Sequence, residues 1–330
     1  MGAGSGAYVI HRLLANHIRD YQVVSYHPSW SLFPFTLPLV TKIKQPDLIH
    51  TVPDYARFFY RKSIPMVISF QNYVLDRGMR LYSSWLQRVH YAVDLKIWTQ
   101  MALEKATVTT AVSRFTARLV KKDLRLNQTP IRVIYNGVDE KIFVPAGRAK
   151  PDQKQIRVFF SGNLTRRKGI HWLPEIAKRL NKNICIYYTQ GLRTRSGLPK
   201  MANLRPIGPV PYPQMPQRYH EVDILLIPTV REGLSVAVLE AMASGLPVVA
   251  SDCSSLPEQI DNGKGGFLCP IGDIDSFAEK INILADSAKL RREMGQYNRA
   301  KIEKQFTLQQ MVRGYKNLFE EILNRSLDIF

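Results

Sequence analysis

The chain has 330 residues, of which 45% are hydrophobic and 22% are charged, a composition typical of globular proteins and a length sufficient for two domains. No apolar segment reaches the roughly 18 residues that span a bilayer. The best candidate, WSLFPFTLPLV at 30–40, is short and contains two prolines. No basic segment precedes an apolar one at the start, so we do not expect a secretory leader there. The sequence has neither zinc-finger spacing nor an arginine-rich tail, so it does not indicate a nucleic-acid-binding protein.

The net charge of +19 is concentrated in residues 1–150, which hold 21 Lys and Arg against 9 Asp and Glu. We therefore expect an anionic partner for this half, such as an acidic membrane surface or a phosphorylated substrate, with solubility as the alternative role of the charge. The three cysteines, Cys185, Cys253 and Cys269, are too few and too widely spaced for a disulfide framework or a zinc site. They predict buried thiols in a cytoplasmic protein, which the basic surface would place peripherally on the inner face of the membrane.

The chain opens on a glycine loop, GAGSGAY, that contains Gly4 and Gly6 and has no strand before it. Such loops normally connect a first strand to a first helix, so either a first strand is missing or the sheet is built without one. An amphipathic helix is predicted over 7–18, with Ile10, Leu13, Leu14 and Ile18 on one face. Strands are then predicted at 21–26, 65–70, 107–113 and 131–137, and Ser113 is the predicted N-cap of a helix over 114–124.

The second half repeats the alternation of apolar strands and helices, with strands predicted at 155–161, 184–189, 223–229 and 246–251. A polar stretch with Pro and Gly at 144–155 is the predicted linker. This order predicts an α/β protein with two Rossmann-like domains, each on a parallel sheet, and a ligand cleft between them. The domains are placed at 1–147 and 148–312.

The segment REGLSVAVLEAMASGLPVVASD at 231–252 carries the strongest chemical pattern. Glu232 and Gly233 fall in the loop after a strand, Ser235 is positioned to cap the next helix, and Gly245 to end it. Glu240 lies in the middle of that apolar helix, where a carboxylate needs a hydrogen-bond partner such as a ribose diol, or alternatively an internal Arg or Lys. The backbone N–H groups at the start of this helix are predicted to bind a diphosphate; they belong to residues 233–236, which are Gly233, Leu234, Ser235 and Val236. Glu232 would reach sugar hydroxyls from the same end.

A second segment, FFSGNLTRRKGIHWLPEIAKRL at 159–180, places a turn at Gly162 after a strand and a helix near Gly169. Arg166, Arg167 and Lys168 cluster just before that helix, where a lysine can neutralise phosphate charge. A solvated basic loop is the alternative interpretation of this segment on its own.

Together the two segments resemble the donor site of glycosyltransferase family 4, whose members have the GT-B fold. The family pattern E-G-x-x-x-x-x-L-E-A-M-A-x-G-x-P-V-V matches from Glu232 to Val249, and VIYNGVDEKIF at 133–143 and LPEQIDNGKGGFLCPIGD at 256–273 also resemble it. The resemblance implies that Glu232 contacts the donor sugar, Glu240 the ribose and Lys168 the diphosphate. It implies that the glycine loop faces the phosphates from the other domain, and that residues 313–330 form a helix crossing back to the N-terminal domain.

The sequence departs from the family at two further positions. Asn163 stands where members usually have an arginine, so Arg166 or Arg167 would have to compensate. Gln71, in ISFQNY, stands where many members have a histidine near the acceptor, and glutamine can orient a hydroxyl but cannot act as a base. His50 is a second acceptor-side candidate, with a packed structural histidine as the alternative.

No metal or other cofactor is expected. The D-x-D of GDIDSF is better explained by Asp273 capping a helix. The basic and aromatic stretch at 77–98 is either a core helix or a surface for a membrane or a lipid-linked acceptor.

The resulting prediction is a retaining transferase that moves a sugar from a UDP- or GDP-sugar to a hydroxyl of a glycan or lipid-linked acceptor. Its catalytic residues would be Glu232 and Lys168, and its setting cell-envelope or exopolysaccharide biosynthesis. The alternatives are a non-catalytic sugar-nucleotide-binding partner of a membrane complex and a nucleotide-sugar epimerase.

Overall fold

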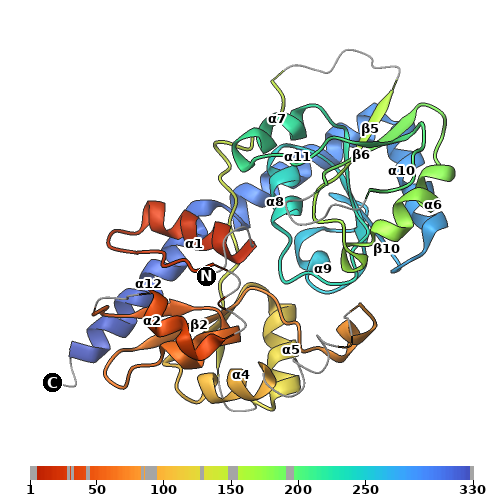
Figure 1. Cartoon of the computed structure of the whole chain (residues 1–330). Helices are drawn as coiled ribbons and strands as arrows, with labels where there is room; N and C mark the ends of the chain where they lie inside the picture. Colours follow the sequence, from red (N-terminus) through yellow and green to blue (C-terminus); the bar gives the residue numbers. More distant parts are fainter. Residues whose placement is uncertain are drawn as a thin grey trace. The chain divides into compact units, whose positions relative to one another are not determined.

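The computed structural model describes residues 6–27, 30, 33–41, 45–82, 85, 95–126, 130–147, 155–190 and 197–327. The chain divides into two compact units, shown in Figure 1. Unit 1 is formed by Met1–Asn136 with Gln309–Phe330, and unit 2 by Gly137–Leu308. Residues 137–147 therefore pack with the second unit. Within the described part of the chain, no helix combines the length and the apolarity that a membrane crossing requires.

Unit 1 is built on a parallel sheet in the order β1-β2-β3-β4. Its strands are β1 (Ile49–Thr51), β2 (Met66–Phe70), β3 (Val108–Ala111) and β4 (Ile131–Val133). Its helices are α1 (Gly6–His17), α2 (Leu37–Thr41), α4 (Lys96–Leu103), α5 (Arg114–Leu124) and α12 (Leu308–Leu327), with 3₁₀ turns η2 (Pro34–Thr36), η3 (Pro53–Phe59) and η4 (Arg77–Tyr82). The strands predicted at 65–70 and 107–113 are thus confirmed over 66–70 and 108–111, and the one predicted at 131–137 is confirmed only over its first three residues.

The local chemistry of unit 1 explains its elements. Every residue of β2 is buried, as expected for the apolar run MVISF in a sheet covered on both faces. The Ser113 side chain accepts a hydrogen bond from the N–H of Thr116, so the predicted N-cap of α5 is confirmed, and such a cap contributes about 1 kcal/mol. Helix α5 ends at Arg125, which adopts the left-handed conformation.

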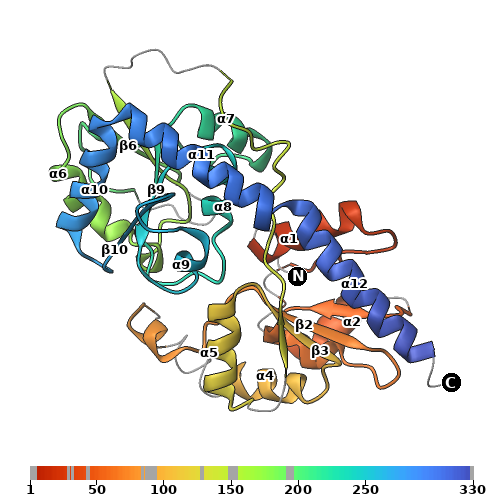
Figure 2. The same ribbon diagram turned by 180° about the vertical axis from the view of Figure 1, so that it is seen from behind.

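The predicted strand at 21–26 is wrong, because this segment belongs to neither sheet. Its first residue instead joins a polar chain beneath α12. The Tyr21 hydroxyl lies 2.6 Å from His11 Nδ1 and 2.7 Å from His50 Nδ1. Figure 2 shows α12 alongside the strands of unit 1, and the rings of Tyr315 and Phe319 on this helix lie 5.0 and 5.3 Å from that of His50.

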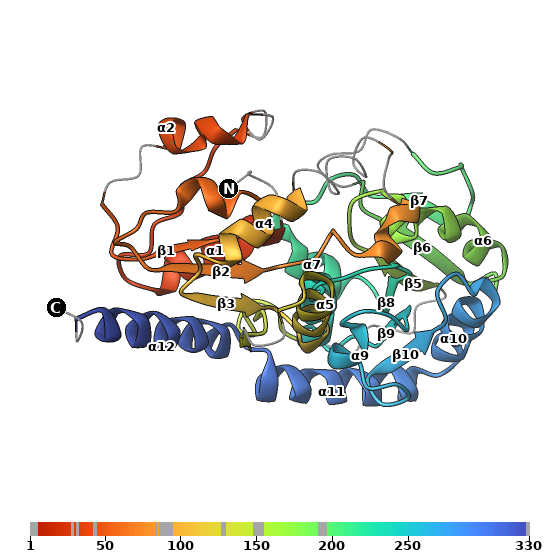
Figure 3. The same cartoon turned by 90° about the horizontal axis from the view of Figure 1, so that it is seen from below.

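Unit 2 holds a parallel sheet in the order β10-β9-β8-β5-β6-β7, which the labels of Figure 3 follow. Its strands are β5 (Ile156–Phe160), β6 (Ile184–Tyr188), β7 (Leu204–Pro206), β8 (Ile224–Ile227), β9 (Val248–Ser251) and β10 (Gly266–Cys269). Its helices are α6 (Leu173–Lys178), α7 (Met215–His220), α8 (Val236–Ala243), α9 (Leu256–Gln259), α10 (Ile274–Asp286) and α11 (Ala288–Gln305), with 3₁₀ turns η6 (Arg166–Lys168), η7 (Ile170–Trp172) and η8 (Tyr212–Gln214). All four strands predicted for this half are confirmed.

The strand pairs of unit 2 direct the carboxyl ends of β5 and β8 to one edge of the sheet. Strand β8 pairs with β5 on one side and β9 on the other, all parallel.

The stretch predicted as a linker, 144–155, is anchored at its start, because His220 Nε2 lies 2.7 Å from the Val144 carbonyl. Residues 148–154 of that stretch lie outside the described residues. Cys185 and Cys269 are buried and Cys253 is half-buried, all three as free thiols.

Candidate functional site

Two loops at the carboxyl edge of the unit 2 sheet meet through an ion pair. Lys168 ends η6, which follows β5, and Glu232 lies in the loop after β8. Lys168 Nζ donates to Glu232 Oε1 at 2.6 Å. The loops are also joined through Arg167, whose carbonyl accepts from the N–H of Val230 at 2.9 Å and the hydroxyl of Thr229 at 3.0 Å. Because β5 and β8 are adjacent and parallel, the two predicted segments come together where a ligand of this fold binds.

Glu232 is held as a carboxylate. Its side chain is 9% exposed, and burial alone would raise its pKa. The charges of Lys168 and Arg167, with hydrogen bonds from Lys168 and Thr229, outweigh burial, so the pKa of Glu232 lies below its ordinary value. Arg167 Nη1 is 3.8 Å from the carboxylate, whereas Arg166 is exposed to solvent, as is Asn163. Of the two arginines predicted to compensate for Asn163, Arg167 is therefore the one beside the site.

Glu240 has no such cation. It lies within α8 and is 5% exposed, and its Oε2 accepts a 2.8 Å hydrogen bond from the buried Tyr219 hydroxyl. No Lys or Arg among the described residues forms an ion pair with it, so the alternative of an internal cationic partner is not seen there. Burial raises the pKa of Glu240 to about 7, and the bond from Tyr219 only partly opposes that rise. A carboxylate can accept about four hydrogen bonds, so Glu240 retains the capacity to bind two hydroxyls of a ligand.

The start of α8 differs from its predicted geometry. Ser235 occupies the N-cap position, but its side chain makes no capping hydrogen bond. The buried Gln259 side chain holds the Ser235 backbone instead, accepting from its N–H at 2.9 Å and donating to its carbonyl at 2.8 Å. The prediction that residues 233–236 all present free N–H groups is therefore wrong at Ser235. Gly233 and Leu234 are buried in the same turn, and Gly245 ends the helix at φ 72°, as predicted.

Two site-supporting residues, Gln259 and Ser254, were not found from the sequence. The Ser254 hydroxyl accepts from the Glu232 N–H at 3.0 Å, which fixes the loop that carries the carboxylate. Ser254 itself adopts a left-handed conformation at φ 51°. The only signal for Gln259 was a polar side chain on an otherwise apolar stretch of LPEQI, which did not point to any particular partner.

Two glycines shape the turn after β5. Gly162 exchanges backbone hydrogen bonds with the hydroxyl of Thr189, at 3.0 and 3.1 Å. Gly169 follows Lys168 in the left-handed region at φ 76°, and a Cβ atom there would meet the Pro228 carbonyl oxygen at 1.8 Å. Only glycine allows the basic turn to approach the end of β8 so closely.

Replacing Gly169 by alanine should lower the free energy of unfolding by about 3 kcal/mol, from the left-handed backbone and the collision together. Gly208→Ala is the matched control, since its φ is 75° but nothing lies within 4 Å of the added atom. It should lose only about 1 kcal/mol. Urea unfolding of both variants measures the difference, and equal losses would show that the contact with Pro228 is not close.

The predicted acceptor-side residues lie in unit 1. Gln71 follows β2, and its Oε1 accepts from Asn136 Nδ2 at 3.1 Å. Gln71 Nε2 and Asn136 Oδ1 are buried and have no hydrogen-bond partner among the described residues. His50 Nε2 lies 2.6 Å from the Ser69 hydroxyl, and Tyr21 occupies its other nitrogen. Burial lowers the pKa of His50 well below its ordinary value, so it is a neutral, packed histidine.

The remaining predicted residues are placed as follows. Gly6 begins α1, and Gly4 lies outside the described residues, as does part of the stretch at 77–98. Asp273 accepts from the Ser276 N–H at 3.0 Å and caps α10, as predicted. No group of three or more His, Cys, Asp or Glu side chains in the described ranges is arranged to hold a metal ion.

Two family models match this chain. The model of "Glycosyl transferases group 1" matches residues 155–287, and that of "Glycosyltransferase Family 4" matches residues 7–142. Among curated relatives, the sulfoquinovosyl transferase SQD2 of Arabidopsis thaliana is 26% identical over 306 residues, which is 84% of this chain and 57% of the relative. The N-acetyl-alpha-D-glucosaminyl L-malate synthase of Bacillus anthracis is 31% identical over 101 residues, 31% of this chain and 26% of that relative. The matches thus span little more than half of the first relative and a quarter of the second.

Solved structures share the fold. The sucrose-phosphate synthase of Thermosynechococcus elongatus superimposes with a TM-score of 0.76 at 16% identity, over 93% of this chain and 82% of the other. Anabaena HepE, solved in complex with UDP and glucose, superimposes with a TM-score of 0.73 at 16% identity, over 97% of both chains.

Proposed function

Because this chain belongs to the group 1 glycosyltransferases of family 4 and has the GT-B fold, we propose that it transfers a sugar from a nucleotide-diphosphate sugar to an acceptor hydroxyl. The observation that carries the proposal is the contact of Lys168 with Glu232 at the carboxyl edge of the unit 2 sheet. Glu232 lies in the loop that leads into α8, the helix that carries Glu240. We assign the sugar to Glu232, the diphosphate to Lys168 and the ribose to Glu240. UDP is the preferred nucleotide, since a structural neighbour is solved with it.

In this proposal the donor replaces contacts that the protein makes with itself. The diphosphate would draw Lys168 away from Glu232, which frees the carboxylate to accept from sugar hydroxyls. Negative charge grows on the diphosphate as the sugar–phosphate bond breaks, so a fixed cation there favours the transition state over the ground state. The N–H groups of α8 assist from the helix start.

On the acceptor side, we propose that Gln71 and Asn136 orient the attacking hydroxyl. Their unpartnered amide atoms are one donor and one acceptor, the pair that a hydroxyl satisfies. Neither amide can take up a proton, so we assign the proton to an oxygen of the departing diphosphate. Attack from the side of the leaving group would retain the anomeric configuration, as the family resemblance implies. The acceptor class is a glycan or a lipid-linked hydroxyl of a cell-envelope pathway.

A screen for UDP and GDP release across common nucleotide sugars tests the proposal. We expect release from one class of donor by the wild type, reduced at least a hundredfold in Glu232→Ala and Glu240→Ala. An NMR spectrum of the product should show the donor's anomeric configuration. Release unchanged in both variants would refute the assigned site.

The second candidate is a non-catalytic sugar-nucleotide-binding partner. Gln71 and Asn163 favour it, because they replace a histidine and an arginine that the family pattern leads one to expect. Calorimetry distinguishes the two functions: a binding partner would bind UDP or GDP and release no nucleotide from any donor.

A further inference from the structure

Unit 1 exposes large apolar side chains in an unusual concentration. Thirteen large hydrophobic residues are exposed among the described residues, and eight of them fall in three short stretches of this unit. They are Trp30 (41% exposed), Phe33 (57%), Phe35 (65%), Leu39 (76%), Val40 (38%), Tyr60 (38%), Ile97 (51%) and Met101 (38%). Scattered exposed apolar residues are normal, but a contiguous group indicates an interaction site.

Five of these eight residues lie in η2, α2 and α4. Phe33 and Tyr60 are cap residues of η2 and η3, and the carbonyl of Trp30 accepts from the N–H of Phe33. The turn η3 contacts η2, α2 and α4, so the three stretches form one surface. The Phe33 and Phe35 rings lie 6.3 Å apart, and the Phe58 ring of η3 lies 5.3 Å from that of Trp98 on α4. Figure 3 shows α2 on the outer side of its unit.

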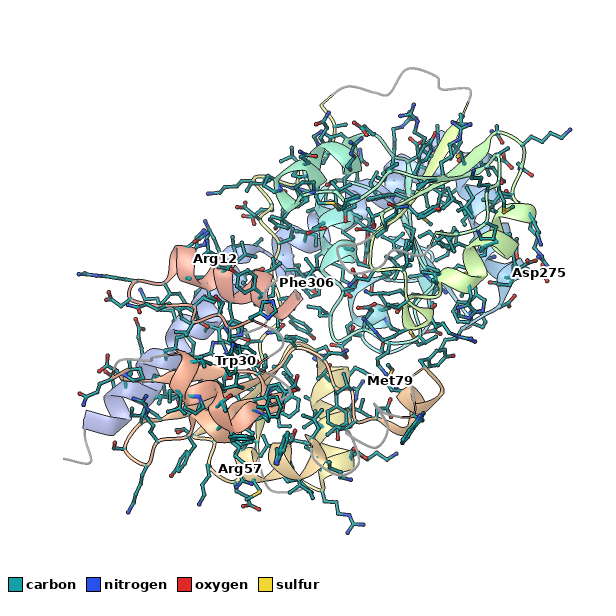
Figure 4. All side chains as sticks on the ribbon, viewed as in Figure 1. Arg12, Trp30, Arg57, Met79, Asp275 and Phe306 are labelled. Carbon is teal, nitrogen blue, oxygen red and sulfur yellow. The ribbon has the colours of Figure 1, made fainter. Side chains whose placement is uncertain are left out.

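Basic side chains lie among the apolar ones. The Arg57 guanidinium contacts the Met101 sulfur and lies 6.0 Å from the Phe58 ring, and Lys105 Nζ lies 6.0 Å from the Tyr60 ring. Trp30 and Arg57 are labelled in Figure 4. Neither Arg57 nor Lys105 forms an ion pair with any described residue. Across 53–62 and 96–105, five basic residues stand against two acidic ones, Asp54 and Glu104. The basic five are Arg57, Arg61, Lys62, Lys96 and Lys105.

We propose that these eight apolar and five basic residues form a docking face that inserts into an anionic lipid bilayer. Exposed Trp, Phe and Leu side chains transfer favourably into the interfacial region of a bilayer, where aromatic rings are enriched. The interleaved cations meet acidic headgroups at the depth where the apolar groups enter. Stable docking on a bilayer needs both the apolar side chains and the cations, and both are present on the same elements.

The charge of the face argues against a second copy of the chain as its occupant. Two copies joined through this face would bring ten basic side chains into one interface with four acidic ones. Such like charges repel one another when desolvated, whereas an acidic bilayer neutralises them. The inference is independent of sugar transfer, since it applies equally to an enzyme and to a non-catalytic partner.

Co-sedimentation of the full chain with vesicles tests the docking face. The probes are vesicles of equal parts phosphatidylglycerol and phosphatidylcholine, and vesicles of phosphatidylcholine alone, at low and high salt. We expect binding to the acidic vesicles that is at least tenfold stronger than to the neutral ones and that weakens with salt. Nucleotide release plays no part in the readout, so failure of the transferase proposal would not affect this test.

Two double variants separate the apolar from the basic contribution. Phe35→Ser with Leu39→Ser should weaken binding to acidic vesicles at least tenfold, because it removes the two most exposed apolar side chains of the face. Arg57→Gln with Lys62→Gln should reduce the preference for acidic over neutral vesicles several-fold. The matched control is Ile271→Ser with Ile283→Ser in unit 2, at positions 46% and 38% exposed, and should bind as the wild type does.

A fluorescence measurement on the wild type tests the docking face without depending on whether the double variants fold. Lipids with brominated acyl chains should quench tryptophan fluorescence on binding, and Trp30→Phe should reduce that quenching. Equal binding by all variants, or no binding by the wild type, would overturn the proposal. Self-association without vesicles, abolished by the apolar variant, would also overturn it and would identify a second copy as the occupant.

Discussion

Replacing Lys168 by methionine is expected to lower kcat/KM for sugar transfer by about two to three orders of magnitude. Methionine keeps most of the side chain's volume but removes the ammonium group that we assign to the diphosphate. The loss of one preorganised group at developing charge has an effect of this size. Steady-state nucleotide release, with donor concentration varied, measures it. A variant that keeps more than a tenth of wild-type kcat/KM would remove Lys168 from the catalytic proposal.

The same substitution should also destabilise the fold, for a reason unrelated to catalysis. Lys168→Met leaves Glu232 buried with its nearest remaining cation, Arg167, at 3.8 Å. Losing one partner of a buried pair costs about 3 kcal/mol. Adding Glu232→Gln should recover most of that stability and none of the activity, since both roles in the donor site are then absent.

Surface substitution provides the control for this pair. Lys178 pairs with Glu175 at 2.7 Å, but the two side chains are 58% and 47% exposed. Water screens exposed pairs, which therefore contribute little to stability, so Lys178→Met should change neither the unfolding midpoint nor the turnover appreciably. Comparable losses from Lys178→Met and Lys168→Met would show that burial does not distinguish the pairs.

The sequence indicated that the loops of Lys168 and Glu232 belong to one site because both segments resemble the same family pattern and each residue follows a recognisable strand. That the two loops meet depends on the pairing of β5 with β8, two strands that are not consecutive in the chain, and the sequence did not predict this pairing. The contacts of Gln259 and Ser254 could not be predicted in this way. They bond to backbone groups of a distant turn, and a side-chain amide that binds backbone has no spacing rule by which to find it.

The strands, too, could be predicted only where the sequence carries a clear local pattern. Buried apolar runs such as MVISF predicted their strands well, whereas β1 (IHT) and β7 (LRP) each hold a single aliphatic residue and carry too little pattern to detect. The segment at 21–26 has the composition of a strand, but its Val23 and Val24 are only half-buried and Tyr21 bonds to His11 and His50. Tertiary contacts overrode its propensity there.

Replacing Glu240 by glutamine is expected to stabilise the protein above neutral pH. The pKa of Glu240 is about 7 in the fold against 4.5 for an ordinary glutamate. Between these pH values the native protein holds a proton that the unfolded chain has lost, so stability falls as pH rises through this window. The loss amounts to roughly 3 kcal/mol once pH passes 7. Glutamine avoids it, and the Tyr219 hydroxyl can donate to the amide oxygen as it does to the carboxylate.

Urea unfolding of wild type and Glu240→Gln at pH 5 and pH 8 should therefore show a gap that opens with pH. Glu293→Gln, at a side chain 57% exposed, should show none.

The gain in stability should come with a loss in nucleotide binding. A hydrogen bond to a charged acceptor contributes about 1.5–3 kcal/mol, against about 1 kcal/mol for a neutral one. With two ribose hydroxyls bound, Glu240→Gln should therefore raise the Kd for UDP by roughly ten- to a hundredfold at pH 8. The wild-type affinity should increase from pH 6 to pH 8 relative to that of the variant, because binding requires the carboxylate and UDP's own titration is common to both. Calorimetry at the two pH values measures this. A variant that gains stability at pH 8 and binds UDP as tightly as the wild type would show that the buried carboxylate is not the ribose ligand; opposite changes in stability and affinity would show that this carboxylate is kept for binding at the expense of the fold.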